Sequence, residues 1–243
     1  MQGILTRHGG ALAPRRFPRL YVPRAGDGCV LWLPGQDDAF GLTIRDRSGN
    51  NNHGTITGAT WTRLPSGLRC LSFDGNDYVE MASSPALNFT SGDFSIIVWI
   101  YLDSLTIHRR LFSRGVYGGA GDGYLFSVNN NGVLEFQSYQ ASAGVQTSQS
   151  AASQITTGSW YTVGLSRVGA SVKLFKNGVN ITSVAGTHVD PATCARTAKI
   201  GIYDDKTNNP WVGKIALVRI YNRALSAAQV ASIYQQERHL FKV

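Results

Sequence analysis

Residues 172–183 read Val-Lys-Leu-Phe-Lys-Asn-Gly-Val-Asn-Ile-Thr-Ser. On both sides of Asn177-Gly178, apolar and polar residues alternate, which is the pattern of a strand with one face buried and one face in water. Asn-Gly is also the dipeptide that best tolerates the positive φ angles of a tight β-hairpin. The stretch therefore predicts two antiparallel strands, Val172–Lys176 and Val179–Ser183, joined by a hairpin turn.

Similar short apolar runs, bounded by turn residues, occupy most of the chain from residue 28 onward. A second Asn-Gly dipeptide, Asn131-Gly132, joins two of them. The other runs that we expect to form strands are Val30–Leu33, Cys70–Phe73, Phe94–Leu102, Tyr124–Val128, Val133–Phe136, Trp160–Leu165 and Ile215–Ile220. Turn signals at intervals of roughly 8–12 residues, without helical segments between them, are typical of an antiparallel sandwich or barrel.

One helix is predicted near the carboxyl terminus. Ser226-Ala-Ala-Gln229 has the form of a capping box, in which the serine and glutamine side chains satisfy free backbone N–H groups at the start of a helix. Val230, Ile233 and Tyr234 follow at the spacing of a single apolar stripe. We expect this helix to close the sandwich and to carry no catalytic group.

The composition of the 243-residue chain fits a single β domain. Hydrophobic residues make up 43% of the chain, enough for one core, and charged residues only 16%, which predicts a surface rich in neutral polar groups. No apolar run approaches the roughly 18 residues of a membrane helix, and residues 1–27 lack the apolar stretch of a secretory signal. The three cysteines are too widely spaced for a zinc site. We expect each of them, Cys29, Cys70 and Cys194, to pack as a small buried hydrophobic residue.

Half of the net charge of +8 lies in residues 1–27, where five arginines face a single acid, Asp27. The same segment holds Pro14, Pro18 and Pro23, which prevent a regular helix and favour an extended path. We therefore divide the chain into a basic arm, residues 1–27, and a domain, residues 28–243. The arginines expected to make the arm's contacts are Arg7, Arg15, Arg16, Arg19 and Arg24.

Six segments of the domain carry a family resemblance. They are residues 46–54, residues 71–79, Phe94–Trp99, Trp160–Val163, Leu174–Gly178 and Ile220–Ser226. In this order they resemble the laminin-G-like, concanavalin A-type lectin jelly roll, over about residues 28–234. The resemblance implies an all-β fold, a jelly-roll sandwich of two antiparallel sheets closed by a short C-terminal helix. It does not extend to the arm.

The inventory of glutamates argues against a glucanase-like site. Retaining glucanases of related fold use two carboxylates roughly 5–5.5 Å apart, commonly from one strand. The chain has only Glu80, Glu135 and Glu237. Neither Glu80 nor Glu135 has a second acid two to five residues further along, and Glu237 falls in the predicted helix. A hydrolase is therefore the least favoured class.

Other catalytic patterns are also missing. The five histidines show no spacing that suits a metal, and the glycine-rich segment Gly115–Gly123 lacks the Lys-Ser/Thr ending of a phosphate-binding loop, so we expect a surface loop there. Two aspartate pairs, Asp74 with Asp77 and Asp204 with Asp205, lie in turn-like contexts that favour solvated turn acids. We predict a protein that is not an enzyme and has no catalytic residues or cofactor.

Calcium is the one ion that the family resemblance suggests. Asp46, Asn50 and Asn52 offer the hard oxygen ligands that calcium needs. Calcium-binding members of the family often carry Asp and Glu at the positions of Ala216 and Leu217, so this chain departs from that pattern. The alternative is that Asp46 and its asparagine neighbours cap a turn.

Sugar binding would require exposed aromatic rings beside amide or acid groups. The best-placed aromatic residues are Tyr117, Tyr139, Tyr203 and Trp211, in loop-like contexts, and Asn208 and Asn209 are close to Trp211. The candidate glycan-binding set is Tyr117, Tyr203, Asn208 and Trp211. The alternative is that aromatic rings such as these cover the edge of the core.

Three classes of function follow from these observations. The first is a structural or decoration protein of a large assembly such as a virus or phage particle, displaying the jelly roll outward and docking the arm to neighbouring subunits. The second is a module that binds cell-surface glycans or mediates adhesion, and the third is a hydrolase. We expect the surface of a virion or extracellular particle as the location, no membrane insertion, and no nucleic-acid partner, because the arm's charge is modest.

Overall fold

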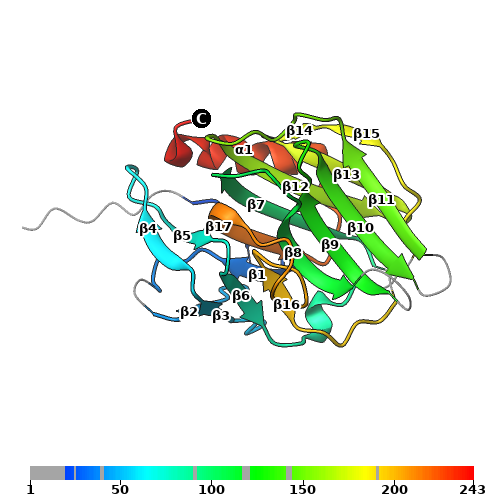
Figure 1. Ribbon diagram of the computed structural model, residues 1–243, viewed down its shortest axis with the longest axis horizontal. Helices are drawn as coiled ribbons and strands as arrows, with labels where there is room; N and C mark the ends of the chain where they lie inside the picture. The colour runs from blue at the N-terminus through cyan, green and yellow to red at the C-terminus, as the bar shows by residue number, and fades with distance from the viewer. Residues whose placement is uncertain are drawn as a thin grey trace, which may run out of the picture.

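The computed structural model describes residues 20–24, 26–38, 41–89, 92–116, 121–140, 144–189 and 192–243, the side chain of Gln140 excepted. Two antiparallel sheets pack face to face, and a single helix of the described chain lies against one of them (Figure 1). The predicted all-β jelly-roll sandwich with a C-terminal helix is confirmed.

The first sheet, sheet A, has eight strands in the described chain, in the order β14-β13-β12-β7-β17-β5-β4, with β1 also paired to β17. The central strand β7 has the bounds that the sequence predicts, because its Ile, Val and aromatic residues are buried on both faces. The bounds are β1 Cys29–Leu33, β4 Thr60–Arg63, β5 Arg69–Asp74, β7 Phe94–Leu102, β12 Trp160–Val168, β13 Ser171–Lys176, β14 Val179–Asn180 and β17 Val212–Tyr221.

The second sheet, sheet B, has nine strands in the described chain, in the order β15-β11-β10-β9-β8-β16-β6-β3-β2. Its bounds are β2 Thr43–Ile44, β3 Gly54–Thr57, β6 Tyr78–Met81, β8 Arg109–Val116, β9 Asp122–Val128, β10 Leu134–Gln140, β11 Gly144–Ser150, β15 Thr182–Val184 and β16 Ala198–Ile200. A short 3₁₀ turn, Pro85–Leu87, follows β6.

The main core lies between the two sheets, where alternate apolar residues of each strand meet. Phe94 of sheet A stands at its centre, with its ring 5.8 Å from that of Phe136 and 5.3 Å from that of Tyr124, both in sheet B. Aromatic pairs at this separation add to the free energy gained by burial.

The helix α1, Ala227–Phe241, packs on the outer face of sheet A, where Figure 1 draws it in red above the strands. Its predicted capping box is present, with both the Ser226 and the Gln229 side chain bonded to the backbone. Val230 and Ile233 are buried as predicted. Beyond them, the ring of Phe241 stacks on Trp99 of β7 at a centroid distance of 3.9 Å.

The hairpin at Asn177-Gly178 is confirmed, since both residues have positive φ and Lys176 pairs with Val179. The prediction of one strand over Val179–Ser183 is wrong. Val179 and Asn180 pair with β13 in sheet A, whereas Thr182–Val184 pairs with β11 in sheet B. The chain crosses from one sheet to the other at Ile181, whose side chain packs on the core.

The expectation of a surface loop over Gly115–Gly123 is also wrong at both ends. Gly115 pairs with Gly123 across strands β8 and β9. Gly123 has a φ of 70°, and a Cβ atom there would lie 1.8 Å from the carbonyl oxygen of Arg114. The glycines therefore permit close strand pairing. Residues 117–120 lie outside the described residues.

The three cysteines are free, with Cys70 and Cys194 buried and Cys29 half-buried. Burial raises the pKa of the Cys70 thiol to about 12, and that of Cys29 to the same value. The thiols of these two residues are therefore protonated at neutral pH. Cys70 packs as a small hydrophobe among Trp32, Leu68 and Trp99, as predicted.

Candidate functional site

Polar side chains cover the outer face of sheet B along strands β8, β9 and β10. Phe126 and Phe136 point into the core, so the residues that alternate with them point outward. These outward residues include Ser127, Glu135 and Gln137. Three neighbouring strands therefore present hydrogen-bonding groups on one surface.

A row of polar contacts crosses this face. Arg110 stands opposite Ser127, which stands opposite Glu135. The Nη1 atom of Arg110 donates to Ser127 Oγ at 3.0 Å, and Gln149 Nε2 donates to Glu135 Oε2 at 2.8 Å. Both Arg110 and Glu135 are 4% exposed, so the two charges are held in fixed positions by packing and hydrogen bonds.

A second set of contacts joins this row to the aromatic residue at the end of β10. The Nη1 atom of Arg110 also lies 3.5 Å from Gln137 Oε1. Tyr139 OH donates to the same oxygen at 2.9 Å. Gln137 therefore links a cation and a phenol, and its amide plane is fixed.

These residues surround an open hollow of about 240 Å³, which we call the groove. Its lining is His108, Arg110, Glu135, Gln137, Tyr139, Val145 and Asn209. A cation, a carboxylate, amides and a phenol thus meet at one solvent-accessible place. A small number of polar groups that converge on a concave surface is typical of a ligand-binding site.

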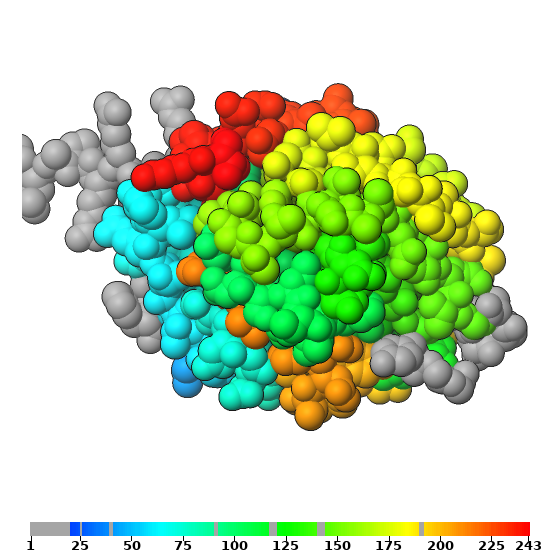
Figure 2. Space-filling model, turned by 45° about the horizontal axis from the view of Figure 1, so that its top comes forward, coloured from blue at the N-terminus to red at the C-terminus, as the bar shows by residue number. Residues whose placement is uncertain are grey.

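The connection between β16 and β17, residues 201–211, forms one side of the groove. Its Asn209 carbonyl accepts a bond of 2.9 Å from the Arg110 amide. The ring of Tyr203 packs with Leu125 and Tyr139 and lies 5.5 Å from the guanidinium carbon of Arg110. In Figure 2 the orange atoms of this connection protrude beside the green strands of sheet B.

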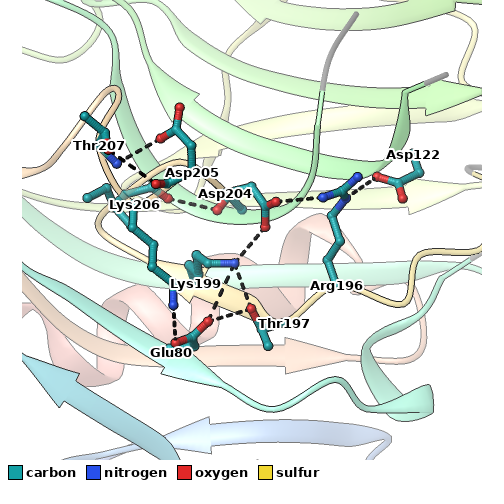
Figure 3. Close-up of polar contacts among 11 residues, drawn as sticks. Glu80, Asp122, Arg196, Thr197, Lys199, Asp204, Asp205, Lys206 and Thr207 are labelled. Atoms are coloured by element: carbon teal, nitrogen blue, oxygen red, sulfur yellow. Dashed lines mark hydrogen bonds and ion pairs between the residues drawn. The ribbon is translucent and has the colours of Figure 1, made fainter. Parts of the chain in front are cut away.

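An ionic network holds the connection on the sheet (Figure 3). Asp204 binds Arg196 at 2.9 Å and the buried Lys199 of β16 at 2.7 Å. Arg196 also binds Asp122, at the start of β9, at 2.9 Å. Two strands of sheet B are thereby tied to the same loop carboxylate, which fixes the loop relative to the groove.

Glu80 of β6 closes the other end of the network. It accepts from Lys206 at 2.9 Å and from Thr197 at 2.7 Å. Burial acts to raise the pKa of Glu80, but the bonds from Lys206 and Thr197 outweigh it and lower the pKa. The carboxylate therefore stays ionised at neutral pH and holds Lys206 of the loop.

The three glutamates lie in three different surroundings. Glu135 is the one acid among the described residues that line the groove. Glu80 lies in the ionic network, and Glu237 is buried in an ion pair with Arg219. Asp205 accepts the backbone N–H groups of Thr207 and Asn208, as a turn acid does.

The described residues of the candidate glycan-binding set do not come together at the groove. Trp211 was expected to be exposed, and this is wrong. It is 0% exposed and packs in the main core, because it directly precedes β17 and turns inward. Tyr203 packs with Leu125 and Tyr139 and does not line the groove, and the exposed Asn208, whose Nδ2 donates to Asp205, also lies outside the groove lining. Tyr117 lies outside the described residues.

Three groove residues were not recognised from the sequence as ligand-binding residues: Arg110, Glu135 and Gln137. Their strands alternate, so Glu135 and Gln137 were recognisable as one outward face of β10. Nothing local indicates that Arg110 joins them, because β8 was not predicted. The notion that Tyr139 covers an edge is closer to the structure, since it is 1% exposed.

The expected calcium ligands form a turn. Asp46 Oδ1 accepts the N–H groups of Trp32 and Ser48 at 2.8 and 2.9 Å, and Oδ2 accepts from Ser48 Oγ and the Asn52 amide. Asn52 Nδ2 donates to the Val30 carbonyl at 2.9 Å. The two Asp46 oxygens thus cap the turn at Ser48 and Asn52 and tie it to Trp32 of β1. Among the described residues, no group of three or more His, Cys, Asp or Glu side chains is arranged to hold a metal ion.

The end of the arm that the structure describes lies on the domain. Leu20 packs against the cluster around Trp32, and the Tyr21 backbone bonds to Arg219 and Glu237. Arg24 is exposed, and its amide donates to Asp27. Arg7, Arg15, Arg16 and Arg19 lie outside the described residues. No helix of the described chain is long and apolar enough to cross a membrane.

Comparison with known families supports the fold. The model of the concanavalin A-like lectin/glucanases superfamily matches residues 73–231. The chain belongs to this superfamily. The superfamily match covers all of the groove's lining and the ionic network from Glu80 to Thr207. A comparison with curated proteins gave no match.

Solved structures of the same fold include toxin binding domains and a domain of an arabinanase. The binding domain of Paraclostridial Mosquitocidal Protein 1 has a TM-score of 0.67 at 16% identity, over 87% of this chain and 52% of that chain. The botulinum neurotoxin serotype G binding domain has a TM-score of 0.63 at 14% identity, over 85% and 50%. This superfamily chain thus spans about half the length of those toxin domains.

The third structure matches along nearly its whole length. Domain 4 of AbnA, a GH43 extracellular arabinanase from Geobacillus stearothermophilus, in complex with arabinotriose, has a TM-score of 0.60 at 20% identity. The match covers 85% of this chain and 98% of that chain. At identities of 14–20%, the similarity between this chain and the three structures is a similarity of fold.

Proposed function

We propose that this protein is a non-catalytic carbohydrate-binding module and that the groove on sheet B is its binding site. The observation that carries the proposal is the convergence of Arg110, Glu135, Gln137 and Tyr139 on one open hollow. Sugars carry neighbouring hydroxyl groups that donate and accept hydrogen bonds, so a site with fixed donors and acceptors suits them. The arabinotriose complex of the AbnA domain supports this choice of ligand.

The absence of catalysis is part of the proposal. Glycoside hydrolysis needs two carboxyl groups, roughly 5–5.5 Å apart for retention or 6.5–9.5 Å for inversion. Glu135 has no acidic partner among the described residues of the groove, and its Oε2 already accepts from Gln149. A lone carboxylate held this way binds hydroxyl groups and does not cleave a glycosidic bond.

A glycan array probed with the full chain, followed by calorimetry on the best ligand, tests the site. Glu135→Gln keeps the size of the side chain and removes its charge, so we expect affinity to fall about tenfold, the effect of one charge-assisted hydrogen bond. Gln236→Ala, exposed on helix α1 and remote from sheet B, is the matched control and should bind as the unchanged chain does. A blank array, or equal loss in both variants, contradicts the proposal.

We propose a second role in a large assembly such as a virus or phage particle, with the module displayed outward and the arm docked on neighbouring subunits. The observation in favour is that the described end of the basic arm is held on the domain, where Tyr21 is bonded to Arg219 and Glu237.

Deleting residues 1–19 removes four of the five arm arginines and keeps the packed residues Leu20 and Tyr21. We expect a folded, sugar-binding protein that no longer incorporates into its assembly. Normal incorporation of the truncated chain into particles would contradict the docking role. The groove is a separate site, so its sugar affinity serves as the internal control for folding.

A further inference from the structure

A buried ion pair beneath the arm offers hydrogen-bonding groups to a peptide backbone. Arg219 of β17 and Glu237 of α1 are both 0% exposed and bind each other. Glu237 Oε2 is occupied by Trp99 Nε1 at 2.9 Å and by Arg219 Nη1 at 3.2 Å. Glu237 Oε1 and Arg219 Nη2, which also bind each other, are the atoms that reach the arm.

Those two atoms bind the backbone of one residue. The amide of Tyr21 donates to Glu237 Oε1 at 3.2 Å, and its carbonyl accepts from Arg219 Nη2 at 2.8 Å. We call this pair of groups the slot. Both bonds go to backbone atoms, so the slot recognises an extended segment through its N–H and C=O groups. The side chain of the bound residue makes no bond to these two atoms.

The neighbouring contacts of the segment are few. Leu20 packs on the cluster that contains Trp32 and Phe241. The Tyr21 ring lies 5.6 Å from the Arg219 guanidinium carbon, and its hydroxyl group donates to Asp27 Oδ2 at 3.5 Å. Val22 is 64% exposed. Two backbone bonds and the apolar packing of two side chains, Leu20 and Tyr21, therefore hold the segment.

A hinge of two glycines joins this segment to the domain. Gly26 and Gly28 have φ angles of 82° and 75°, and Asp27 between them is fixed by Arg223, whose Nε donates to the Asp27 carbonyl at 2.6 Å. A Cβ atom at Gly26 would meet nothing within 4 Å. The left-handed backbone at Gly26 and the turn bond from the Asp27 amide to the Arg24 carbonyl, 3.0 Å long, direct the segment back onto its own domain. Rotation at Gly26 opens this turn and moves the segment while Arg223 keeps Asp27 in place.

We propose that the slot accepts residues 20–24 of a second copy of this chain, so that two copies exchange arms by rotation at Gly26. The two slot bonds are the same in the exchanged form and in the closed form, and only the turn between Arg24 and Asp27 has to open, so exchange depends on hinge geometry and on concentration. The inference rests on the assembly role proposed above and names the residues that connect the copies.

The test uses the full chain and its molar mass in solution over a range of concentrations. Gly26→Val fits sterically but strains the left-handed turn of the closed form, and opening the hinge relieves this strain. We expect its dimer to form at a concentration at least tenfold lower than that of the unchanged chain. If Gly26→Val stays monomeric at millimolar concentration, arm exchange is excluded.

A second substitution in the Gly26→Val background identifies the slot. Tyr21→Pro removes the N–H that Glu237 accepts and should abolish the dimer, whereas Tyr21→Ala keeps both backbone bonds and should retain it. Val22→Ala is the matched control. A dimer that survives Tyr21→Pro overturns the proposal.

Amide hydrogen exchange supplies a readout that does not depend on the folding of the proline variant. In the Gly26→Val dimer, the Tyr21 amide should be protected and the domain should keep the protection of the monomer. Rapid exchange at Tyr21 in the dimer would overturn the proposal. The outcome is separate from the assembly test, which removes residues 1–19 and leaves the slot and the hinge unchanged.

Discussion

His188 illustrates how single residues are accommodated in the interior. It is 0% exposed, and its two ring nitrogens each lie 2.8 Å from a serine hydroxyl group, those of Ser138 and Ser148. Burial, with Arg167 nearby, lowers the pKa of His188 from 6.5 to about 4. A neutral imidazole between two hydroxyl groups satisfies every polar atom, whereas an imidazolium there would be desolvated beside a cation.

This residue predicts a loss of stability in mild acid. Between pH 6.5 and pH 4 the unfolded chain binds a proton at His188 that the folded chain does not, so the free energy of unfolding falls as pH falls. The total contribution is about 3 kcal/mol. Denaturant unfolding at several pH values should show this slope, and His188→Gln should show a flatter profile from a lower starting stability. Parallel profiles would contradict the assignment.

At the scale of elements, the position of helix α1 follows from its first and last turns. The capping box fixes the start at Ser226, and Trp99 and Phe241 fix the far end against sheet A. Glu237, between these points, reaches Arg219 and Trp99. The helix therefore covers the outer face of sheet A around Trp99, whereas the groove lies on the outer face of sheet B.

Removal of the cap measures how much the first turn contributes. Ser226→Ala leaves the Gln229 amide without its acceptor, and we expect the free energy of unfolding to fall by about 1 kcal/mol. Ser232→Ala, an exposed position on the same helix, is the control and should change it by less than about 0.5 kcal/mol. Equal changes in the two variants would show that the cap does not stabilise the helix.

For the whole molecule, the sequence predicts sheet A better than sheet B. Strand β7 and the hairpin at Asn177-Gly178 are encoded locally, by an apolar run and a turn dipeptide. Strand β8 is not encoded locally, because its three arginines are typical of a segment exposed to solvent. Arg114 becomes buried by donating to the Cys194 carbonyl at 2.9 Å, and Arg109 by donating to that of Pro210 at 2.8 Å.

The groove could be predicted only in part for the same reason. Alternation along β10 marks Glu135 and Gln137 as one face, but their meeting with Arg110 and Asn209 depends on strand order and on the folded connection after β16. Trp211 misleads because Asn208, Asn209 and Pro210 precede it like a loop. Tertiary packing, which no local pattern contains, turns its ring into the core.

The strands at the sheet margins have a consequence for behaviour at high concentration. Among the described strands, β14 and β2 have two residues each, β15 has three, β4 has four, and β1, which pairs with β17 alone, has five. Such short margins offer few free backbone groups, so they form poor templates for the edge-to-edge growth that leads to amyloid. Many copies can therefore be crowded side by side with little risk that their sheets fuse.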